Sequence, residues 1–321
     1  MVFQLGVTTV PQNIYSLLDF DQLFVINSLF DVTNENKQSI PIVWVYMTSR
    51  HAALYENVFL RVRNMFAEFA PQVTDIHYIS DDESGQYNSF QHIFAENYNL
   101  TFNLCWFHHN QATIRWLRTN GKAHYINHTS PKYMRIEENL KANLESVLLV
   151  VLRLVYLPAN VIKPVLEYTE ELAHPDLELG DFFNYLIRKM TPSHVIKISW
   201  YEHLKTTEKL ERLDMTSNKL EAQHKSLTRY IGENSASYGT SFIMTVKLAR
   251  EWLTSIYSDH EKYLDGAPLP LNTVSEKQQK RAKWAESWVK MIETRLARGS
   301  SLTTPANIKK LYEFLTKYKD F

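Results

Sequence analysis

The stretch from Ile76 to Ala112 constrains the fold more than any other part of the chain. It begins with a β-prone run at residues 77–79, which leads directly into three acids at residues 81–83. An amphipathic stretch follows, and then a second apolar run that ends in the only cysteine, Cys105. Strand, helix and strand in this order form an α/β unit, and such folds keep their active sites at the carboxyl ends of strands.

The neighbouring segments extend this pattern. Residues 22–30 and 40–47 are β-rich and flank the polar run DVTNENKQS, which predicts a hairpin. Apolar residues recur at helical spacing over 53–69. Strands are expected at 75–80 and 100–105, with a helix over 84–94 between them.

The second half of the chain shows helical periodicity only. Helices are expected over 111–118, 136–156, 159–172, 181–190, 218–230 and 241–264. A proline-containing break at 266–276 precedes a helical tail. Residues 271–321 carry eleven Lys or Arg and five Asp or Glu, so the tail is locally basic.

Composition excludes several classes of protein. The 321 residues have a formal net charge of zero, and hydrophobic residues make up 45%, which is typical of a globular chain. A single cysteine excludes an internal disulfide and suits a reducing compartment. The N-terminus lacks the pattern of a secretory signal, and the most apolar run, Val147–Leu157, is too short to span a bilayer. We expect a soluble intracellular protein that has no membrane partner.

The acids Asp81, Asp82 and Glu83 are the first candidate site. A carboxylate at a strand end is a hard oxygen ligand that suits Mg²⁺ or Mn²⁺. The alternative is a solvated turn and an acidic helix start that complements the helix dipole.

Cys105 and His108 are the second candidate, with the two-residue spacing of half a zinc site. Structural zinc sites need four ligands, and the chain has no second cysteine. A site completed by His109, His124 and His128 is the remaining zinc alternative, and no zinc site is expected. A thiol nucleophile paired with His108 is a further option. Spacing alone favours a cysteine that packs as a small hydrophobe.

The third candidate comprises Asn218, Glu221 and His224 at the head of an expected helix. Asn218 and Glu221 have capping-box spacing, which is a structural explanation. Glu221 and His224 also share a helix face, so both could point at one site.

The basic tail is the fourth candidate. Its aromatic residues are interleaved with the cations: Trp284, Trp288, Tyr312 and Tyr318. This pattern suits either a phosphate backbone or, more commonly, an amphipathic helix with a solvated face.

Taken in order, these segments resemble the transposase domain of Mutator-like elements. The matching segments lie between about residues 20 and 250. They are Gln22-Leu23-Phe24-Val25-Ile26, the apolar run 40–47 followed by Tyr55, Ile79-Ser80-Asp81-Asp82-Glu83, Cys105-Trp106-Phe107-His108 with Gln111-Ala112, Leu154-Val155-Tyr156-Leu157-Pro158, Trp200-Tyr201, and Asn218-x-x-Glu221-x-x-His224.

The resemblance implies a fold of class α/β + α. A ribonuclease-H-like mixed sheet core would occupy residues 1–125 and be interrupted by a helical insertion over 126–215. Residues 216–265 would complete the core and carry the third acid, and 266–321 would form the basic helical tail.

The resemblance also implies chemistry. In the family, two aspartates and a glutamate bind two divalent cations, Mg²⁺ or Mn²⁺, for DNA strand cleavage and transfer. Asp81 corresponds to the second acid and Glu221 to the third, and both are expected metal ligands. Glu83, Cys105, His108, Asn218 and His224 are expected to support the site. The implied partner is DNA at terminal inverted repeats, with a nuclear location and compatibility with a homo-oligomer.

The first acid of the family pattern is missing. Counting back from Pro11 puts Gln4 where the aspartate belongs, or Gly6 if the register is shorter, and neither side chain is a carboxylate. The single cysteine also leaves no material for the zinc modules that usually flank this domain. We therefore expect a fragment, a truncated reading frame or a domesticated remnant with impaired chemistry, or an inactive DNA- or protein-binding module.

Overall fold

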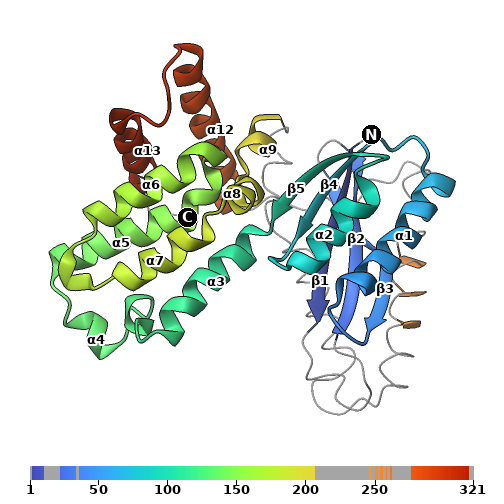
Figure 1. Cartoon of the computed structure of the whole chain (residues 1–321), viewed down its shortest axis with the longest axis horizontal. Helices are drawn as coiled ribbons and strands as arrows, with labels where there is room; N and C mark the ends of the chain where they lie inside the picture. The colour runs from blue at the N-terminus through green and yellow to red at the C-terminus, as the bar shows by residue number, and fades with distance from the viewer. Residues whose placement is uncertain are drawn as a thin grey trace. The chain divides into compact units, whose positions relative to one another are not determined.

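The protein divides into two compact units that alternate along the chain. The computed structural model describes residues 2–10, 22–33, 36–206 and 276–317, with isolated positions between 246 and 261. One unit, called the sheet unit here, consists of Met1–Phe102 and Thr216–Thr273. The other, called the helical unit, consists of Asn103–Met215 and Val274–Phe321. Each is described by itself (Figure 1).

A five-stranded mixed sheet forms the sheet unit, in the order β3-β2-β1-β4-β5. β1 pairs antiparallel with β2 and parallel with β4, and β2 pairs antiparallel with β3 (Figure 1). β1 is therefore the central strand. The strands are β1 (Val2–Val10), β2 (Gln22–Thr33), β3 (Asn36–Met47), β4 (Asp75–Ser80) and β5 (Asn99–Leu104).

Two helices, α1 (Ala52–Phe69) and α2 (Ser84–Phe94), connect the later strands and cover one face of the sheet (Figure 1). α1 carries the chain from the edge strand β3 across the sheet to β4, and α2 connects the neighbouring strands β4 and β5. The ring of Phe59 lies at the centre of the core beneath them. It has ring neighbours on both the sheet and α2, at centroid distances of 5.4–6.3 Å: Phe24, Tyr78, Phe90 and Phe94.

The opposite face of the sheet is covered as well. Side chains alternate between the faces of a strand, and the positions that alternate with the core residues Phe24, Ile26, Ile76 and Tyr78 are also buried. These positions are Val25 (4% exposed), Asn27 (1%), His77 (4%) and Ile79 (3%). At these positions β2 and β4 are therefore buried on both faces.

Helices build the whole of the described part of the helical unit beyond β5. They are α3 (Trp106–Thr119), α4 (Pro131–Met134), α5 (Glu138–Arg153), α6 (Ala159–Leu172), α7 (Gly180–Lys189), α8 (Pro192–Ile198), α9 (Tyr201–Thr206), α12 (Glu276–Ala297) and α13 (Pro305–Lys317). Three short 3₁₀ turns join them: η2 (Ala123–Tyr125), η3 (Leu154–Tyr156) and η4 (Pro175–Leu177).

Buried donors join the tail helices to the rest of the helical unit. The indole N–H of Trp288, on α12, donates to the carbonyl oxygen of Tyr156 at 2.6 Å. The guanidinium of Arg153, at the end of α5, donates to the carbonyl oxygen of Leu315 on α13 and lies 5.7 Å from the ring of Trp284. The basic tail is therefore part of the packed unit.

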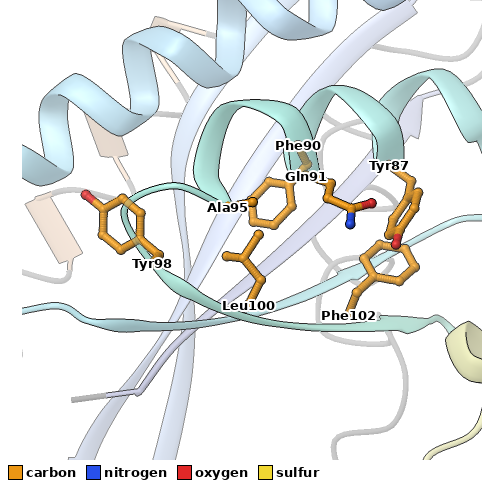
Figure 2. A pocket seen from close by; sticks show the side chains of 7 residues that line it. All are labelled: Tyr87, Phe90, Gln91, Ala95, Tyr98, Leu100 and Phe102. Atoms are coloured by element: carbon orange, nitrogen blue, oxygen red, sulfur yellow. The ribbon is translucent and has the colours of Figure 1, made fainter.

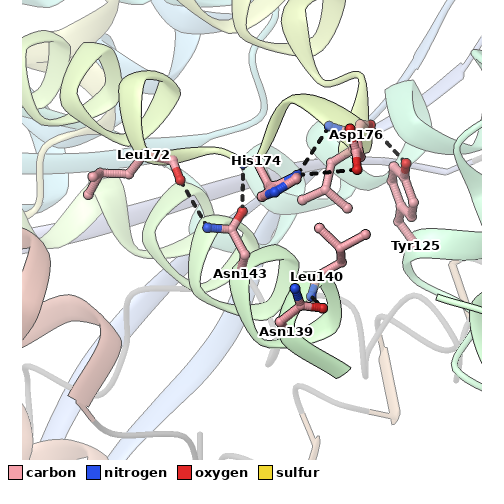
Figure 3. Close-up of polar contacts among 8 residues, drawn as sticks. Tyr125, Asn139, Leu140, Asn143, Leu172, His174 and Asp176 are labelled. Carbon is pink, nitrogen blue, oxygen red and sulfur yellow. Dashed lines mark hydrogen bonds and ion pairs between the residues drawn. The ribbon is translucent and has the colours of Figure 1, made fainter. Parts of the chain in front are cut away.

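The connection after α6 is fixed to α5 by one amide (Figure 3). Asn143 Nδ2 donates to the carbonyl oxygen of Leu172 at 2.9 Å, and Asn143 Oδ1 accepts the N–H of His174 at 2.9 Å. The N–H of Asp176 in turn donates to His174 Nδ1 at 3.3 Å. A single side chain on α5 thus closes the turn that leads into α7.

The mixed α/β class expected from the sequence is confirmed, with more helix than strand among the described residues. The helices over 53–69, 84–94, 159–172 and 181–190 are found within one residue of their expected ends. The segments 218–230, 241–264 and 266–276 lie outside the described residues, apart from isolated helical positions and the first residue of α12. No described helix is long and apolar enough to cross a membrane.

Three elements differ from expectation. β1 is a full central strand, although periodicity alone gave no sign of it. The hairpin strands continue to Thr33 and resume at Asn36, so most of the polar run DVTNENKQS belongs to paired strands. α3 begins at Trp106, five residues before the expected start, because the chain turns into a helix directly after Cys105.

Candidate functional site

Asp81 lies at the end of β4, beside the central strand. β4 ends at Ser80, and the carbonyl oxygen of Asp81 accepts the Ser80 hydroxyl and the Glu83 N–H, both at 2.9 Å. These two bonds fix a tight turn between the strand and α2, which starts at Ser84. The side chain of Asp81 is half-buried, while that of Asp82 is exposed. The turn therefore holds one partly sheltered carboxylate at the strand end.

Glu83 is held in place by a tyrosine from another helix. The hydroxyl of Tyr55, on α1, donates to Glu83 Oε1 at 2.8 Å. The helices approach closely here, since a Cβ added to Gly85 would lie 3.4 Å from the carbonyl oxygen of Arg50, and Ser89 Oγ donates to the carbonyl oxygen of Ala52 at 3.0 Å. Two positions of the family-like pattern thus contact each other, and Glu83 is oriented by a buried partner.

The central strand supplies no carboxylate. β1 has the sequence VFQLGVTTV, without aspartate or glutamate. In the parallel register with β4, Gln4 lies opposite His77 and Gly6 opposite Ile79. Continuing that register by two residues brings Thr8 level with Asp81. The two positions named from the sequence are therefore neighbours of the strand that carries Asp81, and neither provides an acid.

Asn27 was not singled out from the sequence, yet it lies in the row of the sheet that contains Gly6 and Ile79. It pairs with Gly6 across β1 and β2, and its side chain is 1% exposed. Its Oδ1 atom is buried without a hydrogen-bond partner. A lone asparagine within the apolar run LFVINSLF was the available signal.

Cys105 and His108 begin α3 in the helical unit. Cys105 occupies the N-cap position, its thiol forms no disulfide and is fully buried, and its carbonyl oxygen accepts the His109 N–H at 3.0 Å. His108 is half-buried, with its ring 5.5 Å from that of Phe107. A fully buried thiol is a poor nucleophile, so this geometry agrees with a cysteine that packs as a small hydrophobe.

Three family-like segments of the helical unit are joined by buried hydrogen bonds. The Trp200 N–H donates to the carbonyl oxygen of Val155 at 2.7 Å, and its indole N–H donates to that of Leu104 at 3.0 Å. Asn103 Nδ2 donates to the carbonyl oxygen of Ser199 at 2.8 Å. These segments therefore act as structural joints around the start of α3.

The acid expected at Glu221, with Asn218 and His224, lies outside the described residues. That part of the chain belongs to the sheet unit, as does Asp81. Over the ranges that the structure does describe, no three His, Cys, Asp or Glu side chains gather as they would around a metal ion.

A cavity of about 190 Å³ lies between α2 and β5 in the sheet unit (Figure 2). It is lined by Tyr87, Phe90, Gln91, Ala95, Tyr98, Leu100 and Phe102. Burial raises the pKa of Tyr87 above its ordinary value, so this phenol is neutral at physiological pH. The lining thus has no charged group with which to carry out acid–base chemistry.

Comparison of the chain with protein-family models and with curated proteins finds no match in either set.

Proposed function

We propose that the chain is a transposase-derived DNA-processing domain of the Mutator-like type, with a ribonuclease-H-like core and impaired strand-cleaving chemistry. One observation carries the proposal. Asp81 follows β4, and β4 pairs with the central strand β1, which has no aspartate or glutamate. The location proposed for such a domain is nuclear, and its proposed partner is DNA at terminal inverted repeats.

The order of the segments supports the proposed core. A mixed sheet contains β1 to β3 in antiparallel pairing, with β4 parallel to β1. Residues 103–215 form a separate unit before the chain returns to the sheet unit at Thr216. This agrees with a core that a helical insertion interrupts ahead of Glu221.

The residues present do not complete a two-metal site. Divalent cations in such a site would activate the attacking oxygen and stabilise the leaving oxygen, and they need carboxylates from the central strand as well as its neighbour. β1 offers Gln4, Gly6 and Thr8 in the rows at or near Asp81, so the first carboxylate is missing. We therefore propose strand cleavage that is weak or absent.

A second candidate function is DNA or protein binding without chemistry. The acid-free central strand favours it, because two-metal chemistry would need a carboxylate on that strand. Trp288 contributes to the core of the helical unit, at 0% exposure, and does not serve as a stacking platform. Binding would then rely on exposed cations of the tail helices: Lys280, Lys283, Lys290, Lys309, Lys310 and Lys317.

Restoring the first acid tests the proposal. Gly6→Asp and Thr8→Asp, each in the full chain, should give Mg²⁺- or Mn²⁺-dependent nicking of DNA that carries terminal inverted repeats, well above the wild-type rate. Gly6→Asn and Thr8→Asn are the matched controls, since they add similar bulk without charge. Asp81→Asn in the restored background should abolish the gain.

Two results would contradict the proposal. Robust nicking by the wild type that disappears in Asp81→Ala and Glu221→Ala would show that another acid replaces the missing one. Failure of the chain to bind DNA at moderate salt, with no salt-dependent component, would exclude DNA processing and DNA binding and leave protein binding as the candidate.

A further inference from the structure

A second cavity, of about 200 Å³, lies within the helical unit and is lined by side chains from three helices. α3 contributes Trp106, Asn110 and Ile114, α5 with η3 contributes Leu149, Leu152, Arg153 and Tyr156, and α12 contributes Trp284. The α3 residues are four positions apart and the α5 residues follow at spacings of three and four, so each set forms one stripe along its helix.

The cavity has a buried floor and a more open rim. Arg153, Tyr156 and Trp284 are 4%, 3% and 5% exposed and form the floor. The rim residues on α3 and the two leucines are half-exposed. The space therefore opens at one side and is closed by aromatic rings and a guanidinium at the other.

This space is large for a packing defect. Protein interiors are close-packed, and voids larger than a water molecule are few. An engineered cavity of about 150 Å³ is large enough to bind benzene. A cavity of about 200 Å³ can therefore receive one planar ring system.

The lining matches the faces and the edge of a nucleobase. The rings of Tyr156 and Trp284 meet edge to face at 4.7 Å, and Trp106 lies 6.4 Å from Tyr156, which provides aromatic surface on two sides. Asn110 Oδ1 is buried without a hydrogen-bond partner, so it can accept an N–H group. Amides of this kind read base edges, and aromatic rings hold unstacked bases.

We propose that this cavity binds an unstacked nucleobase, with Asn110 accepting an N–H of the base edge and the Trp106, Tyr156 and Trp284 rings holding its faces. The guanidinium of Arg153 adds positive charge to the floor and favours a base attached to a phosphate. The source of the base is a DNA strand, and in this respect the inference rests on the proposed function. A free nucleotide presents the same chemistry, and the experiment separates the two sources.

The experiment uses the full chain and three probes. One is a short single-stranded oligonucleotide that is abasic except for one 2-aminopurine. The second is the same backbone with no base, and the third is dAMP. Affinity is measured by fluorescence of the 2-aminopurine and of the protein's tryptophans. Stacking of one base changes affinity by about 5- to 150-fold, so the base-bearing strand should bind tighter than the base-free strand by that factor.

Two variants locate the effect. Leu149→Trp fills the cavity and should reduce binding of the base-bearing strand to that of the base-free strand. Asn110→Leu removes the acceptor and should weaken base-dependent binding by about 2- to 12-fold, the value of one hydrogen bond. Asn184→Leu, the same change at an exposed position on α7, is the matched control and should bind like the wild type. Unchanged unfolding midpoints for Asn110→Leu ensure that its effect is local.

The possible outcomes separate the two proposals. Equal affinity for the base-bearing and base-free strands would overturn the nucleobase site and leave the DNA-processing function standing. Saturable binding of dAMP that Leu149→Trp abolishes, with no binding of either strand, would support a nucleobase site and overturn both the DNA source and the proposed function. A base preference that survives in Leu149→Trp and Asn110→Leu would place base recognition elsewhere and overturn the inference.

Discussion

The two units are stabilised by different kinds of buried contact. In the sheet unit, aromatic rings pack on one another around Phe59. In the helical unit, the indole N–H groups of Trp106, Trp200 and Trp288 each donate to a main-chain carbonyl oxygen of another element. The stability that ring packing provides falls when side-chain volume is lost. A buried carbonyl oxygen destabilises the fold when its hydrogen-bond donor is lost. The sheet unit should therefore be sensitive to lost volume, and the helical unit to a lost donor.

The largest effect is expected from Phe59→Ala. It removes the ring that lies between the sheet and α2, and large-to-small changes of this kind cost about 3–5 kcal/mol of unfolding free energy. Denaturant unfolding followed by circular dichroism measures the change. Phe69→Ala, the same substitution on the same helix at a side chain that is 73% exposed, is the control and should change stability by less than about 0.5 kcal/mol. Similar losses for both variants would contradict the importance of ring packing.

Trp200→Phe is expected to have the next largest effect. Most of the aromatic volume stays, but the carbonyl oxygen of Leu104 loses its donor, which costs about 1–3 kcal/mol. Trp116→Phe is the matched control, because this half-exposed ring stacks on Tyr185 at 5.4 Å and should depend mainly on ring contact. Equal stability of the two variants in the same unfolding experiment would contradict the importance of buried donors in the helical unit.

A smaller effect is expected from Tyr55→Phe, which removes the hydrogen bond to Glu83. The loss should be about 0.5–1.5 kcal/mol, because the bond is partly exposed. Tyr78→Phe provides the comparison, since the buried Tyr78 hydroxyl has no hydrogen-bond partner and its removal should be neutral or slightly stabilising. A larger loss of unfolding free energy for Tyr78→Phe than for Tyr55→Phe would contradict the stabilising role of the hydrogen bond from Tyr55 to Glu83.

The smallest effect concerns alkaline pH. Burial raises the pKa of Tyr201 in the helical unit to about 12, from its ordinary value of about 10. The folded state holds the proton of the Tyr201 hydroxyl more tightly than the unfolded state does. The resulting contribution to the free energy of unfolding is fully present below about pH 10. It should be lost as the pH rises from about 10 towards 12. Unfolding titrations across this window should show a shallower decline for Tyr201→Phe than for the wild type, and an unchanged slope would refute the role of Tyr201.

The sequence predicted the elements in which a regular apolar pattern and the final packing agree. α6 was expected over 159–172 and is found there, and β4 was expected over 75–80 and is found there. α6 buries residues at the helical spacing that its sequence shows, and β4 buries all of residues 76–80. The strand-end position of Asp81 followed directly from the same pattern.

Elements that depend on partners were harder to predict. β1 carries a glycine and two threonines without alternation, and it becomes a central strand through pairing with β2 and β4. The hydrogen bond between Tyr55 and Glu83 joins residues on different helices, which no local pattern reveals. The basic tail suggested a solvated surface, yet Trp288 is bonded to Tyr156 in η3 and Leu315 to Arg153 at the end of α5, both distant in sequence.

The alternation of the two units along the chain has a consequence for protein engineering. The sheet unit combines Met1–Phe102 with Thr216–Thr273, and the helical unit combines Asn103–Met215 with Val274–Phe321. Each unit is therefore built from two segments that are separated along the chain. No single cut separates the units, so an isolated helical unit requires a new covalent link from Met215 to Val274.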